Sequence, residues 1–254
     1  MPSFDSNGVK INYLVEGTGR PIVLVHGFAS NLHGNWRAPG VVAALVADGR
    51  QVVALDCRGH GRSDTPHDPE AYAGTKMADD VIALMDHLGL EQADLMGYSM
   101  GGFISSSLLT EHPERFRSVI LAGIGDAVLS GGPRRAGLAD AMAADDPSAV
   151  SDPVAKSFRE FAERSGNDLE ALAAMQRAGR VPLDAAKLAD VSIPVMVLVG
   201  EGDTLAGSAE KLAAAIPGAK YARVPGDHLG VFAYPDYTRA VLDFLREAAP
   251  VTAA

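Results

Sequence analysis

The sequence predicts an α/β fold, with a mostly parallel, doubly wound sheet and helices on both of its faces. Short apolar runs rich in Val, Ile and Leu recur along the 254-residue chain, and segments with helical periodicity lie between them. Apolar runs of this kind are typical of strands that are covered on both faces. Strand–helix alternation with short connections favours right-handed crossovers, which produce a parallel sheet.

The first expected strand, residues 9–15, differs from the others because apolar and polar side chains alternate along it. Such alternation predicts an antiparallel strand with one exposed face. The later strands are expected where continuous apolar runs occur, at residues 21–25, 51–55, 93–96, 118–121, 193–199 and 219–224. Helical periodicity predicts helices at residues 41–46, 77–88, 100–110, 209–216 and 239–245.

One segment, residues 125–189, interrupts the alternation because it contains no strand pattern and is rich in Ala, Asp, Gly and Pro. Within it, Asp152 followed by Pro153 is typical of a helix start. We therefore expect a small helical lid at 125–189, inserted between two strands of a core formed by residues 1–124 and 190–254. Ligands of open α/β sheets bind at the carboxyl ends of the strands, which such a lid would cover. The alternative is a surface excursion with no role in substrate choice.

The composition argues against two classes of partner. A net charge of −10 disfavours nucleic acid, which requires clustered Lys and Arg, and also disfavours an anionic membrane surface. The single cysteine, Cys57, excludes an intrachain disulfide and fits a reducing compartment. The first residues lack the pattern of a signal peptide, and no apolar run reaches the roughly 20 residues of a membrane-spanning helix. We expect a cytoplasmic protein that acts on a small molecule.

The strongest chemical signal is the stretch GYSMGG at residues 97–102, which lies between an expected strand and an expected helix. The pattern G-x-S-x-G in this context is the nucleophile elbow, a sharp turn that exposes a serine hydroxyl at the edge of the sheet. Glycines are needed on both sides of Ser99 because a Cβ there would collide with the neighbouring strand and helix. Ser99 is therefore the expected nucleophile, and the alternative is a glycine-rich turn with an incidental serine.

Five motifs in a fixed order give the chain a resemblance to the α/β-hydrolase family, which includes carboxylesterases, lactonases, haloperoxidase-like perhydrolases, carbon–carbon bond hydrolases and epoxide hydrolases. The motifs are VHGF (25–28), DCRGHGRSD (56–64), GYSMGG (97–102), GEGD (200–203) and GDHLG (226–230), and they span nearly the whole chain. The resemblance implies structural roles for Asp56, Arg58 and Ser63, which brace loops below the site. Epoxide hydrolases and haloalkane dehalogenases of this fold use an aspartate nucleophile, so Ser99 disfavours both.

The resemblance also implies the chain order serine, acid, histidine, so the general base is expected after Ser99. His228 fits because it lies in a glycine-containing loop after the last expected strand. The other histidine in this part of the chain, His112, lies near the end of the helix that starts at Ser99. Its better interpretation is a histidine at a helix C-terminus, and we expect His228 to be the base.

The acid that orients the base is expected at a strand end. Asp203 directly follows the apolar run at 193–199 and is the expected acid, with Glu201 a less favoured neighbour. Asp126 remains an alternative, because some members of this fold place the acid after the preceding strand. Asp227, beside the histidine, is interpreted as a solvated loop residue.

The resemblance further implies an oxyanion hole formed by backbone N–H groups. We expect these donors to be Phe28, in the loop after the strand at 21–25, and Met100, directly after the nucleophile. His26 is expected to brace that loop rather than to take part in the reaction. The candidate substrate-binding residues are Trp36, Tyr98, Phe158 and Leu229, of which Trp36 could equally belong to the core.

Together these residues predict a serine hydrolase that cleaves a small carboxylic ester through an acyl-enzyme on Ser99. A short, aromatic-poor lid favours small or short-acyl esters. No cluster has metal-ligand spacing and no dinucleotide motif occurs, so we expect no cofactor. The sequence leaves the oligomeric state undetermined.

Three alternatives to an ester hydrolase remain open within this fold. They are a lactonase or enol-lactonase, a carbon–carbon bond hydrolase, and a signalling receptor that binds a small ligand and turns it over slowly. A lyase that acts on a menaquinone precursor also has a similar elbow, and it would need arginines in the lid to bind carboxylates. The candidates for that role are Arg134, Arg135, Arg159, Arg164, Arg177 and Arg180.

Overall fold

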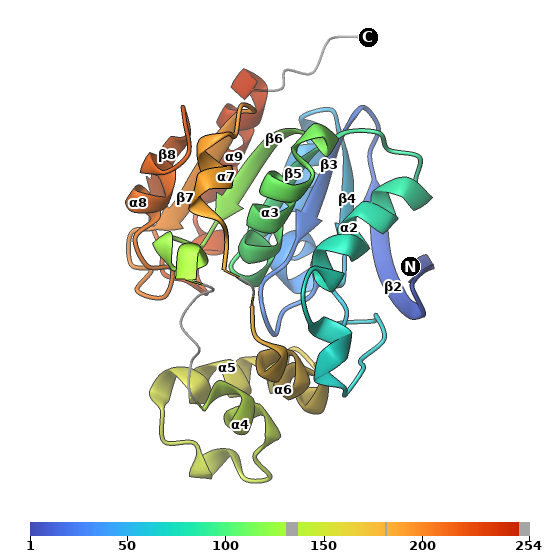
Figure 1. Cartoon of the computed structure of the whole chain (residues 1–254), viewed down its shortest axis with the longest axis vertical. Helices are drawn as coiled ribbons and strands as arrows, with labels where there is room; N and C mark the ends of the chain where they lie inside the picture. The colour runs from blue at the N-terminus through green and yellow to red at the C-terminus, as the bar shows by residue number, and fades with distance from the viewer. Residues whose placement is uncertain (131–136, 181, 249–254) are drawn as a thin grey trace.

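The protein folds around one eight-stranded sheet, described for residues 1–130, 137–180 and 182–248 in a computed structural model. The strand order is β1-β2-β4-β3-β5-β6-β7-β8 (Figure 1). Strands β3 to β8 pair in parallel, whereas β1 and β2 pair antiparallel with their neighbours, so the predicted fold class is confirmed. The strands are β1 (Ser3–Ser6), β2 (Val9–Glu16), β3 (Arg20–Val25), β4 (Arg50–Leu55), β5 (Ala93–Tyr98), β6 (Phe116–Ala122), β7 (Val195–Gly200) and β8 (Lys220–Val224).

All of the predicted strands are present, and the differences are confined to the N-terminal edge of the sheet. Strand β1 was not predicted, because its four residues SFDS contain one apolar side chain, Phe4, and no periodicity. The prediction that one face of β2 is exposed is wrong, because the central residues 11–14 are all buried. Asn12 is accommodated inside the protein since its Nδ2 donates to Asp56 Oδ2 at 2.8 Å.

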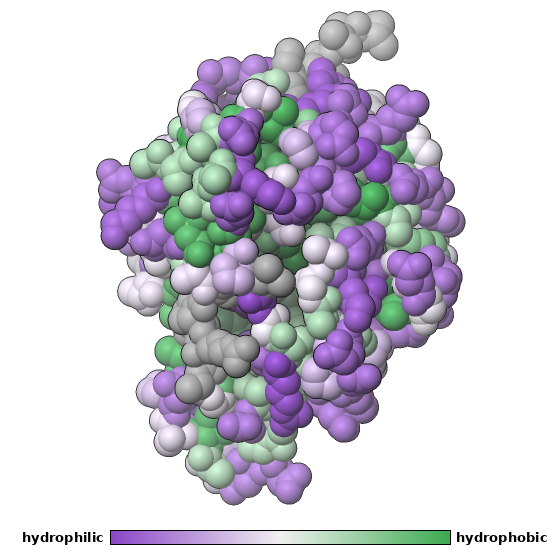
Figure 2. Space-filling view, in the orientation of Figure 1, coloured by the Kyte–Doolittle hydropathy of each residue, from purple (hydrophilic) through white to green (hydrophobic). Residues whose placement is uncertain are grey.

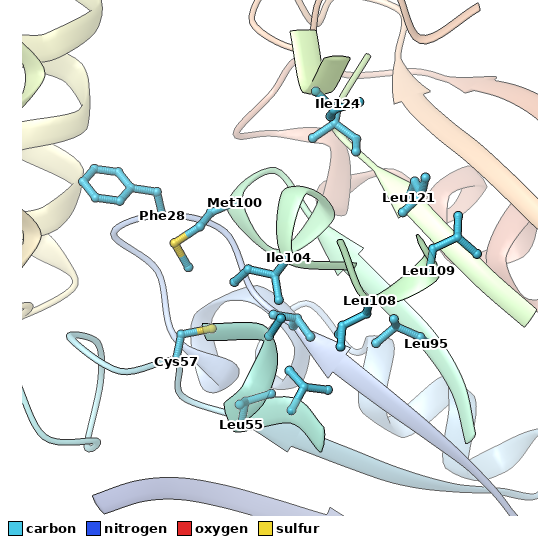
Figure 3. Close-up of a cluster of buried hydrophobic side chains, with 14 of the residues drawn as sticks. Phe28, Leu55, Cys57, Leu95, Met100, Ile104, Leu108, Leu109, Leu121 and Ile124 are labelled. Carbon is cyan, nitrogen blue, oxygen red and sulfur yellow. The ribbon is translucent and has the colours of Figure 1, made fainter. Parts of the chain in front are cut away.

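Two helical layers cover the sheet, and successive residues of each strand enter opposite layers. Val23 and Val25 of β3 pack on the side of α2, α3 and α8, whereas Ile22 and Leu24 pack on the side of α1 and α9. Figure 3 shows Ile104 and Leu108 of α3 against Leu95 of β5. These helices are α1 (Val41–Ala47), α2 (Lys76–His87), α3 (Met100–Glu111), α8 (Ala209–Ala214) and α9 (Pro235–Ala248).

The segment between β6 and β7 is helical, as expected, but it does not form a single unit. Helices α4 (Leu138–Ala143), α5 (Pro153–Arg164) and α6 (Leu169–Ala178) form a group apart from the sheet, here called the cap (Figure 1). Helix α7 (Ala185–Ala189) lies against the core instead, where Lys187 forms an ion pair with Glu111 of α3 at 2.7 Å. The cap lies within the predicted lid of 125–189, of which residues 131–136 and 181 lie outside the described ranges.

The strand order places a topological switch point between β3 and β5. From β3 the chain moves outward to β4, and it then returns past β3 to β5 and continues in the other direction. Loops at the carboxyl ends of two such strands diverge and leave a crevice, which is the usual ligand site of doubly wound sheets. The loop after β3 contains Phe28, and the turn after β5 contains Ser99.

The surface side chains are mostly polar. Figure 2 shows polar and charged side chains over most of one face, with apolar side chains in small groups between them. Among the described helices, none is both long enough and apolar enough to cross a membrane.

A first prediction concerns the close contact between α3 and β3. A Cβ on Gly101 would overlap the carbonyl oxygen of Val25, so the helix could not remain at its position. We expect Gly101→Ala to lower the free energy of unfolding by at least about 2 kcal/mol, measured by urea denaturation. The control is Gly34→Ala, whose Cβ would meet its nearest atoms at 3.5 Å. Equal stability of the two variants would contradict this account.

Candidate active site

Ser99 lies at the sharp turn between β5 and α3 and adopts a backbone conformation that is rare for a residue with a side chain. Its φ is 53° and its ψ is −110°. The turn is held because Ser99 N–H donates to Ala122 O at 2.8 Å and Phe103 N–H donates to Ser99 O at 3.1 Å. A Cβ at Gly97 would overlap Gly101 and Ser105, which explains the glycines on either side of the serine. The elbow predicted from GYSMGG is thus present as backbone geometry.

Ser99, His228 and Asp203 form one hydrogen-bonded chain. The distance between His228 Nε2 and Ser99 Oγ is 2.9 Å, and the distance between His228 Nδ1 and Asp203 Oδ2 is 2.7 Å. The Asp203 side chain is fully buried, and its Oδ1 accepts N–H bonds from Leu205 at 2.8 Å and Ala206 at 3.0 Å. The structure therefore brings together all of the residues predicted as nucleophile, base and acid, although they come from three separate loops.

The alternative acids have other partners. Asp126 Oδ1 accepts from Ser208 N–H at 2.9 Å, and its Oδ2 lies 3.6 Å from Lys211 Nζ, so the side chain holds the start of α8. Glu201 is exposed. In this geometry Asp203 is the carboxylate that contacts His228.

The loop that carries His228 is fixed at both sides of the histidine. Asp227 Oδ1 accepts from the N–H groups of Leu229 at 3.1 Å and Gly230 at 2.7 Å, which makes it a turn-forming residue. Tyr98 O–H donates to His228 O at 2.5 Å, and burial raises the pKa of this phenol well above its ordinary value. His112 lies elsewhere, half exposed and 3.8 Å from Glu114.

Two backbone N–H groups are available beside Ser99. Within the described part of the chain, the N–H groups of Phe28 and Met100 donate to no protein acceptor. Both residues are nearly buried, at 6% and 3% exposure, and they lie at the carboxyl ends of the adjacent strands β3 and β5. Phe28 and Met100 therefore remain the expected donors of an oxyanion hole.

The loop that carries Phe28 is held by side chains from other segments. Asn35 Oδ1 accepts from Gly27 N–H at 2.9 Å, and His60 Nε2 accepts from Ala29 N–H at 3.1 Å. His26 is fully buried and braces the base of the loop, since its Nε2 accepts from Cys57 N–H at 3.0 Å. These contacts matter because Ala29 has a φ of 60°, a conformation that its neighbours must maintain.

Both of these histidines must be neutral to accept an N–H bond. Burial lowers the pKa of His26 below its ordinary value. Burial, together with the nearby His26, lowers the pKa of His60 from 6.5 to about 3. The DCRGHGRSD motif supplies further bracing, since Arg58 binds Asp80 through two hydrogen bonds of 2.7 and 2.6 Å.

Asn167 of the cap was not predicted, and it contacts the same loop. Its Nδ2 donates to Ala29 O at 2.7 Å and lies 3.4 Å from Ser30 O, while its Oδ1 accepts from Gly61 N–H at 3.0 Å. No local pattern reveals this residue, because Ala29 lies 138 positions away in the sequence. Asn167 links the cap to the loop of Phe28 and to the loop of Gly61.

Two cavities meet at Ser99, between the sheet and the cap. Ser99, His228, Phe28 and Phe158 line both of them. The rings of Phe28 and Phe158 pack edge to face with centroids 5.9 Å apart. One cavity is further lined by Phe103, Gly123, Ala127, Leu138, Gln176, Arg180, Leu205 and Ala206. The other is further lined by Gly27, Ser30, Gly34, Asn35, Tyr98, Phe161, Leu229 and Phe232.

Of the predicted substrate-binding residues, Tyr98, Phe158 and Leu229 line these cavities, but Trp36 does not line either of them. Trp36 is fully buried in the core on the side of α1 and α9, with its ring 5.7 Å from that of Phe232. It lies one layer behind the cavity wall, which corrects the interpretation of Trp36 as a substrate contact.

The cap arginines have different environments. Arg159 is buried and caps the end of α4, since its NH1 donates to the carbonyl oxygens of residues 141, 142 and 144. Arg164 and Arg177 are exposed. Arg180 lines the first cavity with its guanidinium 4.2 Å from the ring centroid of Phe103. Arg134 and Arg135 lie outside the described residues.

Within the described ranges, no group of three or more His, Cys, Asp or Glu side chains is placed to hold a metal ion.

Comparison with known proteins gives the same family as the fold. The family model of the alpha/beta hydrolase fold matches residues 20–176. The chain therefore belongs to the α/β-hydrolase family.

The relatives span several hydrolase activities. The chain is 36% identical over 118 residues to a 2-hydroxymuconate semialdehyde hydrolase of Pseudomonas sp. (strain CF600). This alignment covers 46% of this chain and 40% of that protein. The alignments thus span less than half the length of the curated relatives.

Solved structures align over nearly the whole chain. The enol-lactonase of Burkholderia xenovorans LB400 is 27% identical, with a TM-score of 0.75 and coverage of 96% of this chain and 99% of the other. A thermophilic esterase of Thermogutta terrifontis is also 27% identical, with a TM-score of 0.76 and coverage of 97% of both chains.

The low pKa of His60 predicts a pH dependence of stability. An unfolded histidine binds a proton near pH 6.5, whereas folded His60 stays neutral down to about pH 3. The unfolded state therefore binds more protons in this window, so stability falls as the pH falls. Between pH 6 and 4.5, we expect the free energy of unfolding to fall by about 1 kcal/mol per pH unit more in wild type than in His60→Gln. Urea denaturation measures both slopes, and parallel slopes would refute the assignment.

Proposed function

We propose that this protein is a serine hydrolase that cleaves carboxylic esters through an acyl-enzyme on Ser99. The observation that carries the proposal is the hydrogen-bonded chain from Ser99 through His228 to Asp203. A serine hydroxyl is a weak nucleophile unless a base accepts its proton, and the base needs a group that fixes its orientation. All of these groups are within hydrogen-bond distance before any substrate binds.

The first half of the reaction acylates the enzyme. Ser99 Oγ attacks the ester carbonyl carbon while its proton passes to His228 Nε2. The carbonyl oxygen becomes an oxyanion, and the N–H groups of Phe28 and Met100 stabilise it. The tetrahedral intermediate then collapses: its bond to the alkoxy oxygen breaks, and the proton on His228 passes to the departing alcohol.

The second half releases the acid. Water donates a proton to His228 and attacks the acyl carbon, and the proton then returns to Ser99 Oγ as the carboxylic acid leaves. Asp203 does not exchange a proton in either half. It holds the Nδ1–H tautomer of His228, which leaves Nε2 free to accept, and its charge stabilises the imidazolium that forms.

The substrate class is proposed from the cavity and from the relatives together. Two cavities that meet at Ser99 give separate space for the acyl and alcohol parts of an ester. The similar solved structures include an esterase and an enol-lactonase, and a lactone is a cyclic ester that the same steps would open. A carbon–carbon bond hydrolase is the second candidate, because the 36% identity to 2-hydroxymuconate semialdehyde hydrolase favours it.

The direct test is steady-state hydrolysis of p-nitrophenyl acetate and butyrate by wild type and Ser99→Ala. We expect Ser99→Ala to lower kcat/KM by roughly a thousandfold or more. If wild type were as slow as Ser99→Ala on both esters and on simple lactones, ester hydrolysis would be excluded. A carbon–carbon bond hydrolase and a signalling receptor would then be the preferred hypotheses of function.

The position of the acid gives a second, independent test. We expect Asp203→Asn to lower kcat by roughly 10⁴-fold, because an asparagine would favour the wrong tautomer of His228. Asp126→Asn is the matched control and should change kcat by less than about threefold, since Asp126 contacts Ser208 and Lys211. A larger effect of Asp126→Asn would assign the acid to that residue.

Asn167 is expected to position the oxyanion hole from the cap. Asn167→Ala removes the bond to Ala29 O, so we expect kcat to fall roughly tenfold with KM nearly unchanged, because the oxyanion forms only in the transition state. The control is Asn31→Ala, since Asn31 Oδ1 accepts from Gly34 N–H at 2.8 Å, a hydrogen bond within the same loop. A change in KM or melting temperature alone would show a merely structural role.

A further inference from the structure

A third cavity runs along α3, next to the first of the two cavities that Ser99 lines, the one that Arg180 also lines. Its lining begins at Met100, the residue after the nucleophile, and extends to Glu111, the last residue of α3. At 1.5 Å per residue these positions are roughly 16 Å apart along the helix. The cavity is therefore elongated, and one end lies beside the reacting serine.

The walls of this cavity combine apolar and polar side chains, with the apolar ones slightly in the majority. They come from α3, from the start of α2 and the segment before it, from Val128, from α6 and from the residues that follow α6. Methionines are prominent among them, and their flexible side chains adapt to an apolar ligand. The apolar side chains of the lining are Tyr72, Met77, Ala78, Met100, Phe103, Ile104, Val128, Met175, Pro182 and Leu183.

Phe103, Gln176 and Arg180 line both this cavity and the first of the two cavities at Ser99. They therefore form the partition between the two. None of them is fully buried, and the guanidinium of Arg180 covers the ring of Phe103 at 4.2 Å. A ligand that moves the Arg180 side chain off this ring can occupy both cavities at once.

We propose that the cavity along α3 binds the unbranched acyl chain of a medium-length ester whose carbonyl lies at Ser99. The inference rests on the proposed function and names its substrate class. The acyl chain would pass Phe103 and lie along the apolar wall. Glu111 and Asp184 lie among the lining residues at the far end, so the chain should be neutral there. This extends the small ester expected from the short lid to a longer acyl group.

The test compares acyl chain lengths in wild type. Each buried methylene favours binding by about fourfold, so kcat/KM for p-nitrophenyl esters should rise at least tenfold from butyrate to octanoate. A parallel series of alkyl acetates, from butyl to octyl, should stay nearly flat. A flat acyl series, or a rise confined to the alkyl acetates, would overturn the proposal. Absence of any Ser99-dependent turnover would instead remove the proposed function.

A variant that fills the cavity gives the decisive comparison. Ser107 lines the cavity and is half-buried, whereas Thr110 is half-buried on the same helix and does not line it. We expect Ser107→Phe to lower kcat/KM for octanoate at least tenfold while activity on acetate stays within about twofold. Thr110→Phe should keep the wild-type profile. The smaller Ser107→Leu should give an intermediate loss, and equal losses on octanoate and acetate in both Ser107 variants would overturn the inference.

Discussion

The site depends on one close approach, that of the first turn of α3 to the end of β3. Gly101 lies against the carbonyl oxygen of Val25, where a Cβ would not fit. This contact fixes the start of α3 directly after Ser99, whose φ is 53°. Met100 lies between Ser99 and Gly101, and Phe28 follows Val25 in the loop after β3, so the contact joins the two segments that carry the proposed oxyanion donors. The nucleophile and the proposed oxyanion hole are thus consequences of one packing constraint, and mutation of either glycine of the elbow should disturb both.

The loop after β3 shows how distant segments maintain a strained functional geometry. Ala29 has a positive φ, and its N–H and C=O groups are held by His60 and Asn167. His60 belongs to the core and is kept neutral by burial, whereas Asn167 belongs to the cap. Docking of the cap therefore affects the proposed oxyanion hole as well as the cavity wall. In this account the cap completes the machinery and does not simply cover it.

The sequence predicts the sheet well, because buried parallel strands are continuous apolar runs and the motifs GYSMGG, GEGD and GDHLG mark strand ends. It also predicts which residues would meet, since Asp203 and His228 follow the last strands. Sequence patterns do not predict positions that are determined by tertiary contacts. Asn167 carries no local signal. Trp36 was a candidate substrate contact, but it packs in the core on the side of α1 and α9. Helix α7 lies within a segment without strands, yet it packs against the core. Long-range packing and not periodicity determines these features.

The central claim is that Ser99 is a nucleophile activated by His228. Labelling with a serine-directed fluorophosphonate, followed by peptide mapping in a mass spectrometer, tests it without knowledge of the substrate. We expect a single adduct on Ser99 that forms rapidly in wild type and far more slowly in His228→Ala. An adduct on another residue, or equal labelling rates in the two proteins, would contradict it.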